Sequence, residues 1–262
     1  MEREYGGIFA GLYRRYVREF IKKEINRQRI KLIYDIWWYS PLVRFRGMKW
    51  TERWKLIWHI VRVDWFILTA SKPAEIVPVL LDLMSRRARS NEVFLEAGCW
   101  NGGSTAKFSM ACKRYGYGLH VFDSFLGVKE WGYAYGTEET VVRNNIAKYG
   151  IPEICFFHSG WFKDTLRERP PAFPIRMAYI DCDVPTGTLE VLSGILPALV
   201  EDAVIYTQDY HLPEVRSLLQ NEKTWTDLGT KTPTIESVIR NLARITWPNN
   251  DRQSNRPVQP CC

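Results

Sequence analysis

The 262-residue sequence lacks three patterns that would each assign the protein to a class. Its six cysteines form no C-x-x-C pair and show no cysteine and histidine spacing suited to zinc, so we expect a reduced, cytoplasmic chain without a zinc site. Charged side chains interrupt every apolar stretch well below about 20 residues, which argues against a membrane span and a signal peptide. The glycine spacing G-x-G-x-x-G is also absent, which argues against a dinucleotide-binding oxidoreductase.

Basic residues are unevenly distributed along the chain. Residues 1–70 hold 15 lysines and arginines against 7 aspartates and glutamates, whereas the remainder holds 21 against 22. With 46% hydrophobic residues, the chain is able to bury one sizeable core. We therefore predict a basic, aromatic-rich helical extension (residues 1–71), one catalytic domain (72–247) and a disordered tail (248–262).

The N-terminal extension combines two patterns. Apolar residues between Ile8 and Ile21 recur every three or four positions with arginines and lysines between them, which predicts an amphipathic basic helix. Tryptophans from Trp37 to Trp65 follow, interleaved with further basic residues. Packing against the core or a second subunit of a homo-oligomer explains this pattern, and so does peripheral binding to an anionic membrane at its inner face. No nucleic acid is expected, because no recognised nucleic-acid motif accompanies the charge.

The most informative stretch of the sequence runs from Val93 to Thr105. It predicts a buried strand, a glycine turn and a helix start. Gly98 and Gly102 allow a tight turn and a close approach of the backbone to a ligand. Together with Glu96 they give the spacing E-x-G-x-x-x-G, which is typical of the first motif of S-adenosylmethionine-dependent methyltransferases. A glycine turn in another α/β protein would look similar, so this motif alone leaves both interpretations open.

From residue 93 onward, short apolar runs alternate with helical stretches. This pattern predicts an α/β fold with a doubly wound, mostly parallel sheet, whose ligands bind at the carboxyl ends of the strands. The predicted strands are 93–97, 119–123, 153–157, 177–181 and 203–207, and the predicted helices are 104–115, 138–149 and 188–200.

Acidic side chains follow several of these strands. Asp123 ends the second strand, where an acid either hydrogen-bonds the ribose of a bound nucleoside or forms part of a turn. Asp181 and Asp183 follow the fourth strand, and Gln208 and Asp209 follow the fifth. Because these two strands are expected to be neighbours, their oxygen ligands should converge and suit Mg²⁺, while a further carboxylate accepts a proton from an acceptor hydroxyl. Separate, solvated loop acids are the alternative.

Five segments, in this order and spacing, resemble the macrocin O-methyltransferase family over residues 72–220. The segments are 96–104, 122–125, 159–166, 181–183 and 208–210. Members of that family are S-adenosylmethionine- and Mg²⁺-dependent enzymes that methylate sugar hydroxyls of macrolide and aminocoumarin antibiotics, and many relatives lie among glycan or polysaccharide genes. The resemblance therefore implies a Rossmann-like class I methyltransferase fold.

The resemblance also implies a role for each matching residue. Contacts with S-adenosylmethionine would come from Glu96, Gly98, Gly102, Asp123 and Ser124, with Ser159, Gly160 and Trp161 near its adenine. Mg²⁺ would be held by Asp181, Gln208 and Asp209, and Asp183 would be the general base. The sequence departs from the family at Gln208, where members usually carry an acid. A glutamine carbonyl still ligates Mg²⁺ but supplies no charge.

These observations together predict an O-methyltransferase acting on a hydroxyl of a sugar, a glycoconjugate or a related natural product. Residues 126–145, with Trp131, Tyr133 and Tyr135, are expected to form a lid or acceptor wall, unless they pack as a plain loop. His211 is expected to face the acceptor. One alternative is a cofactor-binding protein of the same fold without productive catalysis, which is suggested by Gln208 in place of an acid. A weaker alternative is a nucleotide-dependent oxidoreductase. The motifs do not name the acceptor, because variable loops build acceptor pockets.

Overall fold

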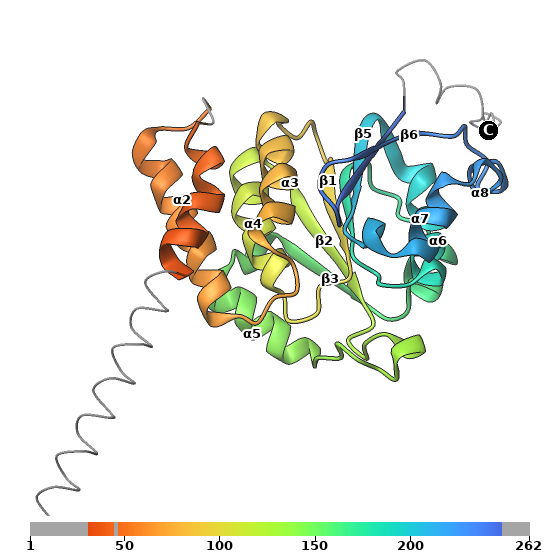
Figure 1. The fold of residues 1–262 in the computed structure, drawn as a ribbon, viewed down its shortest axis with the longest axis horizontal. Helices are drawn as coiled ribbons and strands as arrows, with labels where there is room; N and C mark the ends of the chain where they lie inside the picture. The colour runs from red at the N-terminus through yellow and green to blue at the C-terminus, as the bar shows by residue number, and fades with distance from the viewer. Residues whose placement is uncertain (1–30, 45–46, 248–262) are drawn as a thin grey trace, which may run out of the picture.

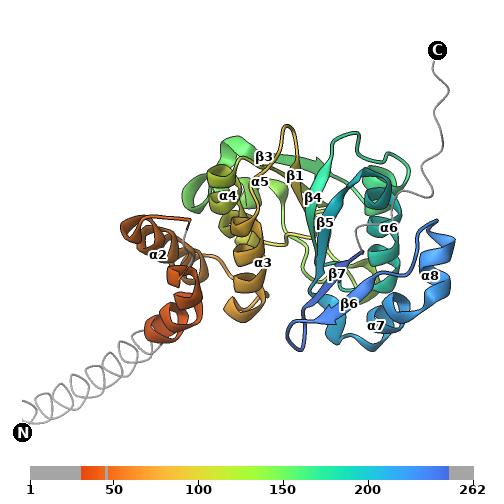
Figure 2. The same ribbon diagram turned by 90° about the horizontal axis from the view of Figure 1, so that it is seen from above.

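The computed structural model describes residues 31–44 and 47–247, which are drawn in colour in Figures 1 and 2. The basic helix predicted between Ile8 and Ile21 and the tail predicted for residues 248–262 lie outside the described residues. Among the described helices, none is both long enough and apolar enough to cross a membrane.

Seven strands form one sheet in the order β3-β2-β1-β4-β5-β7-β6. Strands β1 to β5 are parallel, whereas β7 runs antiparallel to both β5 and β6. The strands are β1 (Val93–Ala97), β2 (Gly118–Asp123), β3 (Cys155–Ser159), β4 (Ile175–Ile180), β5 (Leu199–Thr207), β6 (Thr234–Ser237) and β7 (Ala243–Thr246). The predicted mostly parallel, doubly wound sheet is therefore confirmed, and the order of its strands reverses between β1 and β4.

Helices cover both faces of this sheet, as Figure 2 shows. One face packs against α3 (Pro73–Ser85), α4 (Gly103–Tyr115) and α5 (Glu139–Tyr149). The other packs against α6 (Pro185–Ile195), α7 (Pro213–Gln220) and α8 (Glu222–Asp227). Successive strand side chains alternate between the two resulting cores, so that Phe94 joins the first and Leu95 the second. Double-sided burial explains why these strands are continuous apolar runs in the sequence.

Proline residues explain where the structure departs from the predicted boundaries. The third strand begins at Cys155, two residues later than predicted, because Pro152 starts a short 3-10 turn, η3 (Pro152–Ile154). Helix α6 begins at Pro185, a residue that favours the first turn of a helix. It gives way at η5 (Leu196–Ala198), because Pro197 has no backbone N–H to continue the ladder. Strand β5 consequently begins at Leu199, and the hairpin of β6 and β7 was not predicted.

The described part of the N-terminal extension is helical, as predicted. Residues 31–39, η1 (Ser40–Arg44) and α2 (Trp50–Phe66) lie outside the layer of α3 and α4 (Figures 1 and 2). Ile57 and Ile60 of α2 join the apolar core beneath them. Asp64 of α2 forms a buried ion pair with Lys107 of α4 and accepts a hydrogen bond from the Tyr39 hydroxyl at 2.6 Å. One face of the extension therefore packs against the domain.

Candidate active site

A pocket of about 590 Å³ opens at the carboxyl ends of β1, β2, β4 and β5. This is the point at which the strand order reverses, where sheets of this kind bind ligands. Seven of the predicted site residues line the pocket: Gly98, Asp123, Ser124, Trp161, Asp181, Asp183 and Gln208. The other five, which do not line it, are Glu96, Gly102, Ser159, Gly160 and Asp209.

The glycine turn after β1 joins the two sides of the pocket. Gly98 has a φ of +88°, and a Cβ placed there would lie 1.8 Å from the backbone oxygen of Asp181. Only glycine therefore allows the ends of β1 and β4 to approach this closely. Gly102 also has a positive φ, but its missing side chain would meet Val142 of α5 rather than the pocket. The first turn of α4, at Gly103 and Ser104, then faces the pocket with its free N–H groups.

Asp123 is bound by the backbone of two turns. Its Oδ2 accepts hydrogen bonds from the N–H groups of Cys99 at 2.7 Å and Trp100 at 3.3 Å. Its Oδ1 accepts one from the N–H of Phe125 at 2.7 Å. The carboxylate thus shapes the glycine turn and the turn after β2, and it also reaches the pocket surface. Both interpretations of this acid, as a turn residue and as a ligand-facing residue, agree with its position.

Glu96 lies in the middle of the molecule, beneath the pocket. It is fully buried on β1, and neither of its carboxylate oxygens has a hydrogen-bond partner. Burial raises its pKa from 4.5 to about 7, an effect that the nearby hydroxyls of Ser104 and Thr105 and the ammonium of Lys107 oppose and the charge of Asp123 adds to. When ionised, such a buried carboxylate without hydrogen bonds is stabilised by a positively charged group nearby.

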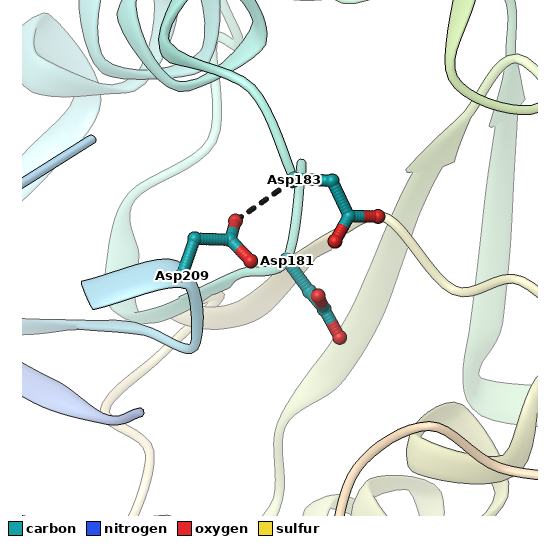
Figure 3. Close-up of side chains that lie close together, drawn as sticks. All are labelled: Asp181, Asp183 and Asp209. Carbon is teal, nitrogen blue, oxygen red and sulfur yellow. Dashed lines mark hydrogen bonds between the residues drawn. The ribbon is translucent and has the colours of Figure 1, made fainter. Parts of the chain in front are cut away.

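Three carboxylates lie together beyond β4 and β5 (Figure 3). Asp181 and Asp183 follow β4, and Asp209 begins η6 (Asp209–His211) after β5. One oxygen from each lies within 4.8 Å of the others. The predicted convergence of these acids is therefore present in the structure.

Asp209 holds this group in place through the backbone. Its Oδ2 accepts hydrogen bonds from the N–H groups of Cys182 and Asp183, both at 2.8 Å. These bonds fix Asp183 in a left-handed conformation with a φ of +63°, which is unfavourable for a residue with a side chain. The Oδ1 of Asp209 is buried without a hydrogen-bond partner. The structure therefore directs one unsatisfied carboxylate oxygen toward the other two acids.

The acids lack a compensating cation. Among residues 31–44 and 47–247, no lysine or arginine forms an ion pair with Asp181, Asp183 or Asp209. Burial and the charge of Asp209 raise the pKa of Asp181 well above its ordinary value. Burial also raises the pKa of Asp183, whereas the neighbouring His211 lowers it. Such a group is costly to keep ionised unless a cation binds to it, so the donor set fits a divalent metal ion.

Gln208 is held by an acid that the motifs did not predict. Its Nε2 donates a hydrogen bond to the Oε2 of Glu75, on α3, at 3.1 Å. Glu75 is almost fully buried and also accepts hydrogen bonds from the N–H of Lys72 and the side chain of Asn241. Its sequence signal was its place three residues after Lys72, at the start of a helix, which is typical of a capping residue.

The segment after β3 contributes one of its three predicted residues to the pocket. The hydroxyl of Ser159 is exposed and donates a hydrogen bond to Glu139 of α5. The N–H of Gly160 donates to the backbone oxygen of Asp123 at 2.9 Å, which joins β3 to the turn after β2. Trp161 lines the pocket.

A hairpin between β2 and α5 covers part of the pocket. It is closed by a bridge between Val128 and Ala134, around η2 (Lys129–Trp131). Tyr135 lines the pocket and contacts the ring of Trp100 edge to face, with ring centroids 5.2 Å apart. Trp131 and Tyr133 are exposed and do not line the pocket, so of the three aromatic residues predicted for this wall Tyr135 alone lies at the pocket.

The hairpin is also tied to the opposite side of the pocket. Glu130 accepts a hydrogen bond at 2.9 Å from the hydroxyl of Thr186, in the first turn of α6. Both residues line the pocket. His211 lines it as well, as predicted, and its Nδ1 is buried without a hydrogen-bond partner.

Comparison with known proteins identifies the fold. Residues 95–210 match the family model Methyltransf_24, a methyltransferase domain. This is the Rossmann-like fold of the methyltransferases. No curated protein matches the chain. The narrower resemblance to the macrocin O-methyltransferases is not singled out by these comparisons and stays a prediction.

Three solved structures illustrate the likeness of fold. The O-methyltransferase NovP is 20% identical with a TM-score of 0.53, over 65% of this chain and 80% of NovP. The SAH-bound methyltransferase PaMTH1 of Podospora anserina is 14% identical with a TM-score of 0.50, over 74% of this chain and 87% of its own. Cofactor-bound Rv0187 from MTB is 13% identical with a TM-score of 0.50, over 79% and 94%. At these identities the likeness concerns the fold.

Proposed function

We propose that the protein is an S-adenosylmethionine-dependent O-methyltransferase that acts, with Mg²⁺, on a hydroxyl of a sugar, a glycoconjugate or a related natural product. The observation that carries this proposal is the pocket itself, in which a glycine turn lies near a group of three carboxylates that form no ion pair with any lysine or arginine of the described residues. S-adenosylmethionine carries positive charge on its sulfonium and ammonium groups, and a metal ion adds more. The acidic pocket suits both.

The residues of the first half of the pocket fit the methyl donor. The N–H groups at the start of α4 suit its carboxylate, because a helix N-terminus carries partial positive charge. The buried charge of Glu96 lies below and favours its ammonium group. Asp123 offers its remaining acceptor positions to the ribose hydroxyls, and the ring of Trp161 provides a surface for the adenine.

The residues of the second half fit a magnesium ion. The unsatisfied Oδ1 of Asp209 and the carboxylate of Asp181 are hard oxygen ligands at one point. Because Glu75 holds the amide nitrogen of Gln208, the amide oxygen of that side chain is directed away from Glu75. The negative charge of Glu75, one hydrogen bond behind Gln208, offsets the charge that Gln208 itself does not supply. Bound Mg²⁺ would orient the acceptor hydroxyl and lower its pKa.

In this proposal, Asp183 accepts the proton of that hydroxyl. It lines the pocket beside the other two acids, and burial raises its pKa toward the range in which a carboxylate is an effective base. Bound S-adenosylmethionine would supply the methyl group to the deprotonated acceptor oxygen, with its own sulfur as the leaving group. The hairpin tied to α6 through Glu130 excludes water from this side and presents Tyr135 to a sugar ring.

The decisive experiment compares cofactor binding and turnover in Asp183→Asn. We expect the wild-type protein to bind S-adenosylmethionine in calorimetry and to consume it with a sugar or glycolipid acceptor when Mg²⁺ is present. Asp183→Asn should lower kcat about 1000-fold, because a general base is lost, while cofactor affinity stays nearly unchanged. Asp164→Asn, which removes a different acid of the pocket lining, is the matched control.

Each other result has a distinct meaning. Tight binding of NAD without binding of S-adenosylmethionine would overturn the proposal in favour of an oxidoreductase. Binding of S-adenosylmethionine without turnover on any acceptor would favour the cofactor-binding protein. Wild-type turnover in Asp183→Asn would show that the base is another residue, and turnover unaffected by EDTA would remove the metal.

A further inference from the structure

The outer face of α2 carries a row of exposed tryptophans. Trp50, Trp54, Trp58 and Trp65, here called the tryptophan stripe, are all partly to largely exposed, and Trp50 and Trp58 are 59% and 51% exposed. Their spacing places the four side chains within about 80° of the helix circumference, since successive residues are 100° apart. In Figures 1 and 2, α2 lies on the outside of the layer formed by α3 and α4. The domain's own packing therefore leaves more than a third of each of these four side chains exposed.

The preceding helix also carries exposed apolar side chains. On residues 31–39, Ile33, Tyr34 and Trp37 are each more than half exposed. Aliphatic as well as aromatic side chains are thus open to solvent on the same outer layer. Exposed large apolar side chains that gather on one surface indicate a site for a partner or a membrane.

The charges around the stripe are of one sign. Its acids are buried or paired: Asp35 is buried, Asp64 forms a buried ion pair with Lys107, and the partly exposed Glu52 pairs with Arg114 at 2.6 Å. Lys49 and Lys55 are exposed, and no acid of the described residues pairs with them. The surface therefore offers indole rings flanked by ammonium groups that no acid of the described residues neutralises.

The stripe also leads to the mouth of the pocket. Leu68, just after α2, is 72% exposed and lines the pocket. Phe66, at the end of α2, is also exposed. Exposed apolar side chains thus follow the stripe along the chain as far as the rim of the pocket.

We propose that this surface docks on an anionic lipid membrane. Indole rings prefer the region of the lipid headgroups, and lysines next to them are attracted to anionic lipids. A second copy of the chain fits less well, because a symmetric contact would bring the lysines of the two copies together. A nucleic acid would pair with the lysines but leave the exposed aliphatic side chains in water. The docked orientation would bring the pocket rim close to lipid-linked acceptors, a consequence that rests on the proposed function.

The test uses the full-length chain and vesicles of phosphatidylcholine in which one quarter of the lipid is phosphatidylglycerol. We expect the protein to sediment with these vesicles, to bind less as salt is raised, and to bind poorly to pure phosphatidylcholine. Brominated lipids should quench its tryptophan fluorescence. The triple variant Trp50→Gln, Trp54→Gln and Trp58→Gln should bind at least about tenfold more weakly and lose most of the quenching.

Charge reversal provides a second, matched comparison. The pair Lys49→Glu and Lys55→Glu should weaken binding about tenfold as well. The control pair, Arg167→Glu and Arg169→Glu, makes the same change of net charge at exposed positions beside η4 (Lys163–Arg167), which packs on α6 at the other face of the sheet. It should bind like the wild type. Thermal unfolding of every variant confirms that the fold is retained.

Four results would overturn the proposal. The first is that the protein does not sediment with anionic vesicles, and the second is that binding is unchanged in the tryptophan and lysine variants. The third is a dimer in analytical ultracentrifugation that the tryptophan substitutions dissociate, with no vesicle binding. The fourth is an oligonucleotide complex that the tryptophan substitutions abolish, with no vesicle binding. None of these measurements requires methyl transfer, so their failure leaves the proposed function standing.

Discussion

The acid after β2 and the acids after β4 and β5 occupy the same edge of one sheet but differ in their hydrogen bonds. Both oxygens of Asp123 accept backbone N–H groups, so that carboxylate is satisfied before any ligand arrives. Asp209 accepts two N–H groups on Oδ2 alone, and its Oδ1 has no partner. Glu96, on β1 between them, has no hydrogen-bond partner on either oxygen.

This difference separates acids that build the pocket from acids that are held ready for a ligand. A satisfied carboxylate stabilises the fold without any ligand, because N–H dipoles already compensate its charge. An unsatisfied, buried one costs free energy until a cation or proton arrives. Unfavourable negative charge is therefore concentrated at Glu96 and at the ends of β4 and β5, where the proposed ligands carry positive charge.

The largest effect is expected from Gly98→Ala, which disrupts both sides of this comparison at once. The added Cβ would lie 1.8 Å from the backbone oxygen of Asp181, and the residue would have to keep a φ of +88°. We expect cofactor affinity to fall by at least about 100-fold and thermal stability to fall markedly, because backbone on both strands must move. Calorimetry with S-adenosylmethionine and a thermal melt measure both.

Gly229→Ala is the matched control for that substitution. It has a φ of +72° and open space around its missing side chain, so only the conformational cost of about 1–2 kcal/mol remains. Equal losses in the two variants would show that the close approach at Gly98 does not matter.

The second effect concerns the pH dependence of stability through Glu96. Its pKa of about 7 in the folded protein lies above the ordinary value of 4.5, so the folded state binds this proton more tightly than the unfolded state. The stability from this group is therefore fully present below about pH 4.5 and is lost as pH rises through about 7. At about pH 8, the free energy of unfolding of Glu96→Gln should exceed that of the wild type by on the order of 3 kcal/mol. At low pH the two proteins should differ little in stability.

Thermal melts of both proteins across this pH range make the measurement. Glu201→Gln, at an exposed position, is the control and should leave the pH profile unchanged. If the profile of Glu96→Gln followed that of the wild type, Glu96 would be satisfied in the folded protein and would belong with Asp123.

The smallest effect, and the most direct test of the comparison, pairs Asp123→Asn with Asp209→Asn. At Asp123 the new NH₂ group must face a backbone N–H, and the lost hydrogen bonds should cost about 2 kcal/mol, or about 4–8 °C in Tm. At Asp209 the amide oxygen replaces Oδ2, while the NH₂ group takes the place of the unsatisfied oxygen and removes a negative charge. The Tm of Asp209→Asn without metal should therefore be retained or raised.

Added Mg²⁺ completes that measurement. It should raise the Tm of the wild type and of Asp123→Asn but not that of Asp209→Asn. Similar losses of stability in both variants, or an equal response to Mg²⁺, would contradict the division between the two kinds of acid.

Much of the fold follows from local pattern. Strands such as β1 and β4 are continuous apolar runs because both of their faces are buried, and the glycine turn after β1 needs a residue without a side chain. Boundaries near Pro152, Pro185 and Pro197 were predicted less well, since a proline ends or starts a turn according to its neighbours. The strands β6 and β7 are too short for an alternation of apolar and polar residues to identify them, so their hairpin was not predicted.

The sequence by itself determined which chemistry is available: a glycine turn, acids after successive strands, and a basic, tryptophan-rich extension. Only the tertiary structure decided which acids are satisfied, because hydrogen bonds such as those of Asp123 to Cys99 join residues distant in the chain. It also placed Glu75 behind Gln208 and paired the acids of α2, which left the tryptophan stripe flanked by lysines alone. Burial and long-range contacts set the free energy of each charge, and neither is encoded in local spacing.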